Sequence, residues 1–377
     1  MPGSPNVLSS TTCAARCAHR WSHVLLWVCV VGLAGPVGAG QAIRVLTVGN
    51  SFAENATEFL PELARSRGVA LTVRQANIGG SDLARHARHL QASLENTNDP
   101  DGRPYMEGSD PERTRHSLVE ILGAGPWDFV TLNQFSGFSH RPETYEPHVG
   151  QLIAAIRLHA PTARIVVLQT WAYRSDHPLF LPAQRELQSA YERVVWERSR
   201  DTVHAPGTLT QRAMHEQLRS AYDQVAARYG VLLVPVGDAF QMARATSEWR
   251  FTHPDPDFDY VNPAPGSLPR QKGSLIGGWF WLADRQSGEM SLALDAKHAN
   301  VAGKYLGACV FFEALTGVDV REAAWHPDRL STAEAGSLRE IAHAAVVARR
   351  DAETLTFTET APDRREDILS DAATSRY

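Results

Sequence analysis

The sequence predicts an α/β fold in which helices cover both faces of a parallel sheet. Short apolar runs alternate with longer helical patterns along the chain, and this alternation is typical of such sheets. The run Val231–Val236 is almost wholly apolar, as expected for a strand that is buried on both sides. The predicted strands are Ile43–Val48, Val69–Val73, Phe129–Leu132, Arg164–Leu168 and Val231–Val236.

Helical periodicity separates these strands. One helix is predicted to begin near Leu83, because Ser81 or Asp82 can cap it there. The segment 96–110 is rich in Asn, Asp, Gly and Pro, which predicts a surface loop. The other predicted helices are Phe52–Arg67, Tyr145–His159, Met214–Tyr229, Val301–Leu315 and Ser331–Arg349.

The first 39 residues have the layout of a signal peptide. Arg16 and Arg20 precede an uncharged run from Val24 to Gly35, which is too short to cross a bilayer as a helix of roughly 20 residues. Small residues before Gly40 suit cleavage near Ala39, and the context of Cys29 does not suit a lipid anchor. We therefore predict export to the periplasm or beyond, without a stable membrane anchor.

Composition narrows the class of protein further. At 377 residues and 43% apolar content, the chain can bury a large core. Loss of the leader removes two of 37 basic residues, so 35 face 42 acidic residues and the net charge is −7. The sequence has no stripe of basic residues that would predict nucleic-acid binding. Cys309 is the only cysteine after the leader, which excludes an internal disulfide framework.

Ser51 occupies a position where chemistry is expected. It follows the first predicted strand on a Gly49-Asn50 turn and begins a helix, at the carboxyl edge where open α/β sheets bind ligands. Amides at a helix start can also stabilise negative charge. Serine is equally a common helix cap, so this pattern alone leaves both interpretations open.

Asp295 and His298 stand three residues apart, just ahead of the helix predicted from Val301. A serine hydroxyl is a poor nucleophile until a base removes its proton, and an imidazole does so best when a carboxylate fixes its tautomer. The pair has the residue types for these two roles. Alone, the motif is also compatible with a polar helix end.

Together these segments resemble the SGNH (GDSL-like) hydrolase superfamily. The Gly49-Asn50-Ser51 turn, Gly80, Asn133 and the Asp295/His298 pair follow the order of its sequence blocks. Over Ile43–Gly317 the chain is most similar to an uncharacterised branch with a GNSF first block and a C-terminal DxxH.

This resemblance implies a three-layer α/β/α sandwich with a parallel five-stranded, flavodoxin-like sheet. Ser51 would be the nucleophile, His298 the base and Asp295 its orienting carboxylate, with no metal or other cofactor. The backbone N–H groups of Ser51 and Gly80, with one amide side chain, would form the oxyanion hole. The implied domains are a signal peptide at 1–39, the hydrolase domain at 40–330 with a loop insertion near 248–290, and a helix with a charged tail at 331–377.

The third block departs from the superfamily pattern. A Gly-x-Asn-Asp is expected where Leu132-Asn133-Gln134-Phe135-Ser136 stands. Because alternation along a strand end aims only one neighbouring side chain at the site, we favour Asn133 as the amide donor, with Gln134 as the fallback. Gly80 is preferred to Gly79 by resemblance to the second block.

Four aromatic residues are candidates for substrate binding. Trp171 and Tyr173 follow the predicted strand Arg164–Leu168 at the same sheet edge, where they could line a cleft or belong to the core. Trp279 and Trp281 could stack on a sugar ring, although such clusters are more typical of cores.

Two patterns that suggest metal ions have simpler interpretations. His86 and His89 share a helix face without further ligands, which favours solvated helix histidines. Asp255, Asp257 and Asp259 alternate in a loop that lacks the Gly and Glu of an EF-hand, which favours an exposed acidic loop.

The expected function is that of an exported serine esterase that removes a small acyl group from carbohydrate through an acyl-enzyme. The substrate class is an analogy with the superfamily's deacetylases. The alternatives are a non-catalytic carbohydrate-binding protein that uses Trp279 and Trp281, and a lipase or thioesterase of the same superfamily. The sequence leaves the acyl group, the alcohol, the fate of the leader and the oligomeric state open.

Overall fold

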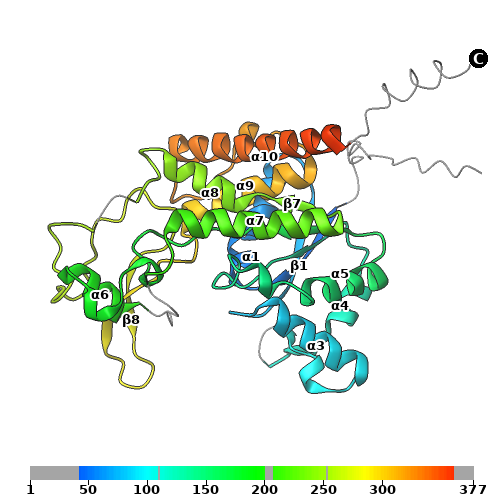
Figure 1. The fold of residues 1–377 in the computed structure, drawn as a ribbon, viewed down its shortest axis with the longest axis horizontal. Coiled ribbons are helices and arrows are strands. Elements are labelled where there is room, and N and C mark those ends of the chain that lie inside the picture. Colours follow the sequence, from blue (N-terminus) through cyan, green and yellow to red (C-terminus); the bar gives the residue numbers. More distant parts are fainter. Residues whose placement is uncertain (1–41, 109–110, 200–206, 252–253, 361–377) are drawn as a thin grey trace, which may run out of the picture. The chain divides into compact units, whose positions relative to one another are not determined.

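The central sheet of the computed structural model includes β1 and β7, which are labelled in Figure 1. Its five parallel strands have the order β2-β1-β5-β6-β7. This is the order of doubly wound, flavodoxin-like sheets, in which the chain starts inside the sheet and extends it in both directions. The predicted parallel five-stranded sheet is therefore confirmed. Its strands are β1 (Ile43–Gly49), β2 (Leu71–Asn77), β5 (Phe129–Leu132), β6 (Arg164–Leu168) and β7 (Leu232–Val234).

The structure describes residues 42–108, 111–199, 207–251 and 254–360. Contacts along the chain separate Met1–Pro36 from Val37–Tyr377, and all elements below belong to the second unit. The predicted leader at 1–39 and the end of the charged tail, 361–377, lie outside the described residues. Within the described ranges, no helix has the length and apolar character needed to span a bilayer.

The register of the sheet brings three strand ends level with one another. Gly49 pairs with Asn77 of β2, and Val48 pairs with Leu132 of β5. Strand β1 is buried along almost its whole length, as expected for a strand with neighbours on both sides and helices on both faces. The turn that follows Gly49 therefore opens between the ends of β2 and β5.

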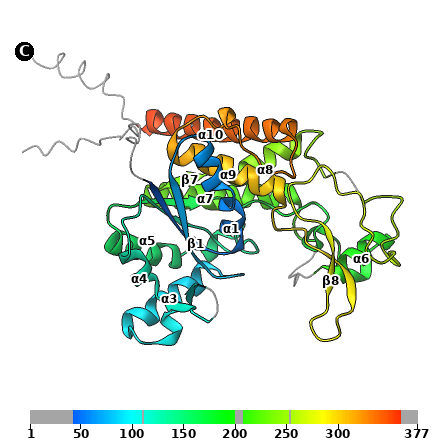
Figure 2. The same ribbon diagram turned by 180° about the vertical axis from the view of Figure 1, so that it is seen from behind.

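One group of helices packs around α9, an almost wholly apolar helix that is buried along most of its length. The side chain of Asn300 caps its start by accepting from Gly303 N, and Gly317, at φ 73°, ends it in the left-handed conformation that favours glycine. Figure 2 shows α10 lying along α8 and α9. The group comprises α1 (Ser51–Thr57), α2 (Leu60–Ser66), α8 (Val236–Ala245), α9 (Val301–Thr316) and α10 (Thr332–Thr360).

Of the remaining large helices, α3, α4 and α5 pack against one another, and α7 contacts α8 and the sheet. Helix α3 begins as predicted, with the Asp82 side chain accepting from Arg85 N at 2.7 Å. Helix α4 begins with a capping box between Ser117 and Glu120. Helix α7, the longest of these four, packs on β6 and β7. The four helices are α3 (Leu83–Glu95), α4 (Leu118–Gly123), α5 (His148–His159) and α7 (Gln211–Tyr229).

Two of the differences from the predicted elements occur at proline residues. The helix predicted over Phe52–Arg67 is divided into α1 and α2, because Pro61 lies in the first turn of a new helix. The strand predicted over Val231–Val236 ends at Val234, and after Pro235 the chain enters α8. Strand β2 also lies later than the predicted Val69–Val73.

The predicted loops contain short regular elements. Strands β3 (Tyr105–Glu107) and β4 (Thr114–His116) form one antiparallel pair. Strands β8 (Trp279–Ala283) and β9 (Met290–Leu294) form another, against which α6 (Ala190–Arg198) packs (Figure 1). A small hydrophobic cluster of its own holds this hairpin and α6 together.

Close packing of α9 against α1 depends on Gly307. A Cβ at this position would lie 2.9 Å from the Ala56 Cα, which is too close for backbone. We expect Gly307→Ala to lower the free energy of unfolding by about 1–3 kcal/mol through overpacking, despite the better helix propensity of alanine. Urea unfolding monitored by circular dichroism measures this change.

Gly336→Ala is the matched control. Gly336 lies in α10 with open space around its Cα, the nearest atom to a new Cβ being Arg339 Nη2 at 3.9 Å. This substitution should raise the free energy of unfolding by about 0.5–1 kcal/mol. Equal effects of both substitutions would contradict the packing argument.

Candidate active site

Ser51, His298 and Asp295 form a continuous hydrogen-bonded line. Ser51 Oγ lies 2.9 Å from His298 Nε2 although the residues are 247 positions apart, and His298 Nδ1 lies 2.8 Å from Asp295 Oδ2. Ser51 is the first residue of α1, and the other two residues stand in the loop between β9 and α9. The structure thus brings together the three residues that the sequence predicted as a catalytic set.

Asp295 is held in place by its own loop. Its Oδ1 accepts from the backbone N–H groups of Lys297 and His298, both at 3.0 Å, while Oδ2 faces the imidazole. Burial raises the pKa of this carboxyl, but the hydrogen bonds from His298 and from the two amides outweigh burial and hold the pKa well below its usual value. An ionised Asp295 keeps the proton on Nδ1, so Nε2 is free to accept from the Ser51 hydroxyl.

The backbone of the histidine loop is fixed from three directions. Asn55 Oδ1, one turn along α1 from Ser51, accepts from Ala299 N at 3.0 Å. Gly277 N donates to His298 O at 2.8 Å. Trp171 Nε1 donates to Lys297 O at 2.9 Å. The helix that carries the serine therefore also positions the histidine.

Aromatic rings pack beneath the imidazole. Phe52 stacks on Trp171 with ring centroids 4.4 Å apart, and Trp171 stacks on Phe240 at 4.5 Å. The Phe52 ring lies 5.6 Å from the His298 ring. This stack gives the histidine a rigid support.

Asn50 joins three strand ends through its side chain. Its Oδ1 accepts from Phe52 N and from Asn133 Nδ2, both at 3.1 Å. Its Nδ2 donates to Ser81 O at 2.9 Å and to Gln134 O at 3.3 Å. Sequence reasoning treated Asn50 only as part of a turn and missed this role.

The backbone N–H groups of Ser51 and Gly80 have no hydrogen-bond acceptor among the described residues. Ser51 stands at the start of α1, and Gly80 lies in the loop after β2. Gly80 has φ 65°, which favours glycine, and the space where its Cβ would stand is open. The loop is tied to the serine turn because Ile78 N donates to Gly49 O at 2.9 Å.

The amide side chains predicted to complete an oxyanion hole direct their hydrogens to other acceptors. Asn133 Nδ2 uses both hydrogens within the protein, toward Asn50 Oδ1 and Gln134 O. Gln134 Nε2 uses both of its hydrogens on Thr144. Gly49 explains the position of Asn133, because a Cβ there would lie 1.8 Å from Asn133 Oδ1. The expectation of a free amide donor from Asn133 or Gln134 is therefore corrected.

The aromatic candidates for substrate binding are largely buried. Trp171 is 0% exposed and Trp279 is 4% exposed, so both belong to cores. The hydroxyl of Tyr173, also buried, lies 2.9 Å from Ser136 Oγ. Trp281 is partly buried and donates to Ser267 O. Because it is buried, Trp171 does not line a substrate cleft. For the same reason the Trp279 ring is not available to stack on a sugar.

His86 is fully buried, which corrects the prediction of a solvated histidine. Its Nε2 lies 2.9 Å from Gly49 O, and its Nδ1 lies 2.8 Å from the Tyr105 hydroxyl. A carbonyl only accepts, so Nε2 carries the proton and Nδ1 accepts from Tyr105. His86 thus supports the strand end that leads to Ser51. His89, on the same helix, instead contacts the Asp101 carbonyl.

The acidic loop has an internal counter-ion. Arg270 pairs with Asp255 at 2.7 Å and with Asp257 at 2.6 Å. Asp259 Oδ1 accepts from two backbone amides of its own turn. These contacts support the prediction of an acidic surface loop over a calcium site.

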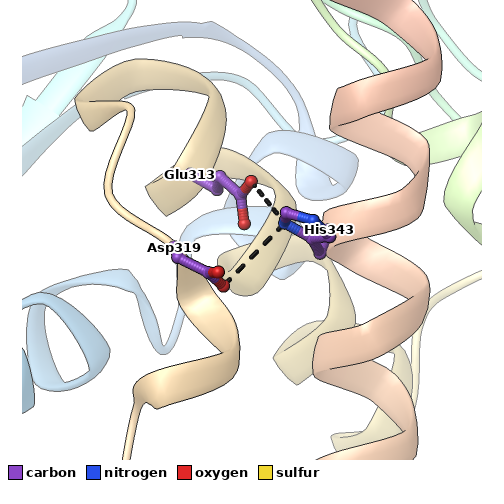
Figure 3. Close-up of side chains that lie close together, drawn as sticks. All are labelled: Glu313, Asp319 and His343. Atoms are coloured by element: carbon purple, nitrogen blue, oxygen red, sulfur yellow. Dashed lines mark hydrogen bonds and ion pairs between the residues drawn. The ribbon is translucent and has the colours of Figure 1, made fainter.

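Within the described residues, Glu313, Asp319 and His343 offer one cluster with ligand atoms close enough for a metal ion (Figure 3). Each already has a partner in the protein. Glu313 Oε1 accepts from His343 Nδ1 at 2.8 Å, and its Oε2 accepts from Val320 N. Asp319 pairs with Arg321, whose hydrogen bonds lower the pKa of Asp319 to about 2. The cluster therefore ties α9 to α10.

Fold and site together define a flavodoxin-like α/β protein with a Ser–His–Asp arrangement at the carboxyl edge of its sheet. Residues 44–205 match the family model described as "Domain of unknown function (DUF4886)". This region contains Ser51 and Gly80 and ends before Asp295. A comparison with curated protein sequences found no match.

One solved structure shares this kind of fold. A DUF4886 family protein from Bacteroides uniformis is 22% identical, with a TM-score of 0.55 over 81% of this chain and 95% of that chain. A proposed GDSL-like lipase from Parabacteroides merdae is 11% identical, with a TM-score of 0.38 over 74% and 99%. A possible lipase from Chitinophaga pinensis is 9% identical, with a TM-score of 0.31 over 72% and 96%.

His86 should make the stability of this strand end depend on pH. Burial lowers the pKa of its imidazole to about 4, so between about pH 6.5 and pH 4 the unfolded chain binds a proton that the folded chain does not. Stability should therefore fall as the pH falls through this window, by at most about 3 kcal/mol from this residue. Urea unfolding at several pH values measures the slope.

The His86→Gln variant isolates this contribution. It removes the titrating group, so its free energy of unfolding should vary less between pH 7 and pH 4 than that of the native chain. His215 also has its pKa lowered to about 4 by burial and remains in both proteins, so only the difference between them reports on His86. Identical slopes would contradict the assignment.

Proposed function

We propose that this protein is an exported serine esterase that removes a small acyl group from carbohydrate. The observation that carries the proposal is the 2.9 Å contact between Ser51 Oγ and His298 Nε2, with Asp295 on the opposite nitrogen of the ring. A serine that only capped a helix would need neither partner. The set fits nucleophilic catalysis with a positioned base.

The reaction would proceed through an acyl-enzyme. Ser51 Oγ attacks the ester carbonyl carbon as its proton passes to His298 Nε2. The C–O bond to the alcohol then breaks, and the leaving alkoxide takes the proton from Nε2. Water attacks the acyl-enzyme, gives a proton to the same nitrogen and releases the acid, and Ser51 recovers its proton.

The backbone amides of Ser51 and Gly80 are the proposed oxyanion donors. Both are free of acceptors among the described residues, and each well-aimed donor is worth roughly 2.7–4 kcal/mol in such a transition state. The side chains of His298 and Asp295 are each 31% exposed. This exposure leaves the base accessible to the water that deacylation needs.

Two arguments favour a small acyl group on carbohydrate. The leader predicts export, which gives access to polysaccharides, and the sequence resembles a superfamily that contains deacetylases. A lipase or thioesterase would use the same Ser51 chemistry with a different acyl group. The alternative of a non-catalytic sugar binder loses its main support, because the proposed platform residue Trp279 is buried.

Removal of the nucleophile is the first test. We expect Ser51→Ala to abolish fluorophosphonate labelling and to lower turnover of an activated acetyl ester by at least about 10³-fold, since no other group supplies the attacking oxygen. Ser66→Ala, an exposed serine in α2, is the control and should behave like the native chain. Full labelling of Ser51→Ala would reject the nucleophile.

Asp295→Asn tests the orientation of the base. The amide cannot hold Nδ1–H as the carboxylate does, so kcat should fall about 10³–10⁴-fold while KM changes little. Steady-state kinetics on the same acetyl ester measure both constants. An unchanged kcat would mean that Asp295 only caps its loop. Acetylated xylan, pectin and sialic acids, compared with long-chain esters, then identify the acyl and alcohol preferences.

A further inference from the structure

A cavity of about 230 Å³ lies beside the segment that follows β6. None of Ser51, Asp295 or His298 lines it, so it is distinct from the site described above. It is large for a bare inorganic ion, because one water occupies about 30 Å³ in the liquid. The lining residues are Arg174, Ser175, Gln211, Gln241, Arg244, Ala245, Trp249, Arg250, Phe251, Ser274, Leu275 and Ile276.

The charged groups in the lining are all arginines. Arg174 is neutralised by a two-point ion pair with Asp176, at 2.7 and 2.9 Å. No carboxylate of the described residues lies within 4.0 Å of the guanidinium of Arg244 or Arg250. The cavity therefore has an excess of positive charge.

Arg250 is exposed and donates to Ala245 O at 3.0 Å, whereas Arg244 is a buried cation that lacks a carboxylate partner in the described part of the chain. Its hydrogen bonds go to uncharged acceptors: Gln241 Oε1 and the backbone carbonyls of Ala172 and Tyr173. Burial lowers the pKa of its guanidinium to about 9, which reflects the cost of a buried cation without a counter-ion. An anion in the cavity would offset that cost.

The rest of the lining fits the body of a small molecule. Gln211 and Ser274 add polar groups, while Trp249 and Phe251 add rings. The Phe251 ring lies 4.3 Å from Arg174 Cζ, so one side of the cavity combines apolar and cationic surface. A ligand with one anionic group on a compact carbon body would match this mixture.

We propose that this cavity binds a small organic anion, with Arg244 and Arg250 holding its carboxylate, phosphate or sulfate group. The wall residues link this cavity to the histidine loop, because Leu275 O accepts from Asn300 N at 3.0 Å and Ile276 forms a bridge with Ala299. The proposal goes beyond the esterase function and does not depend on it, since binding requires no turnover.

Isothermal titration calorimetry tests the proposal on the folded chain. The probes are galacturonate, glucose 6-phosphate, inorganic sulfate and uncharged glucose, each titrated into the native protein and into Ser51→Ala. We expect one or both sugar anions to bind in both proteins, sulfate to bind more weakly and glucose not to bind. The two sugar anions distinguish a carboxylate from a phosphate ligand.

Arginine substitutions locate the binding. Arg250→Gln changes an exposed residue and should fold, and Arg244→Gln removes the buried cation. Each should weaken binding at least about tenfold, because a charge-assisted hydrogen bond is lost. Arg285→Gln, exposed on the turn of the β8–β9 hairpin, should bind as the native chain does. Absence of binding by every anion, or undiminished binding by Arg250→Gln, would overturn the proposal.

Discussion

The buried amide of Asn50 is the constraint on which the proposed site depends. All four of its hydrogen-bonding positions are used, and they connect the serine turn to the loop after β2 and to the end of β5. A buried amide that makes all of its hydrogen bonds holds its neighbours in place, because breaking any of them would leave a costly unpaired group in a low-dielectric interior. The same contacts hold the backbone of Ser51 beside the loop that carries Gly80. The geometry needed at the serine is therefore set before any substrate arrives.

The proposed site also requires the loop that carries His298 to contact the turn that carries Ser51. Helices α1 and α9 are in direct contact, and the two glycines of α9 permit close approach: Gly307 against Ala56, and Gly303 beside the Leu275 carbonyl. Asn55 then joins α1 to the backbone just after His298. Ser51 begins α1, and His298 lies in the loop just ahead of α9. Because these two helices pack together and Asn55 holds that loop, core packing limits the separation of nucleophile and base.

These contacts explain how much the sequence could predict. Ser51 and Asp295/His298 were predictable because a strand–turn–helix junction and a short motif are local signals. Pro61 and Pro235 were also visible, and they mark the helix break and the strand end that the periodicity missed. The positions of Asn133, His86 and Trp171 were not predictable, because each depends on a partner from a distant part of the chain: Asn50, Gly49 and Lys297 respectively. Hydrogen-bond partners of buried polar groups follow from how distant segments pack together, which no single segment encodes.

The segment 274–278, within the insertion predicted near 248–290, has a larger role than a surface loop would have. Gly278 O accepts from Asp295 N, and Gly277 N donates to His298 O, so this segment pairs with the loop that carries the base. Gly277 is needed for this approach, since a Cβ would lie 2.9 Å from Asp295 O. On the same segment, Leu275 and Ile276 line the cavity that contains Arg244 and Arg250. A movement of this segment would therefore change both the position of His298 and the shape of the cavity, which makes it the physical link between the two sites.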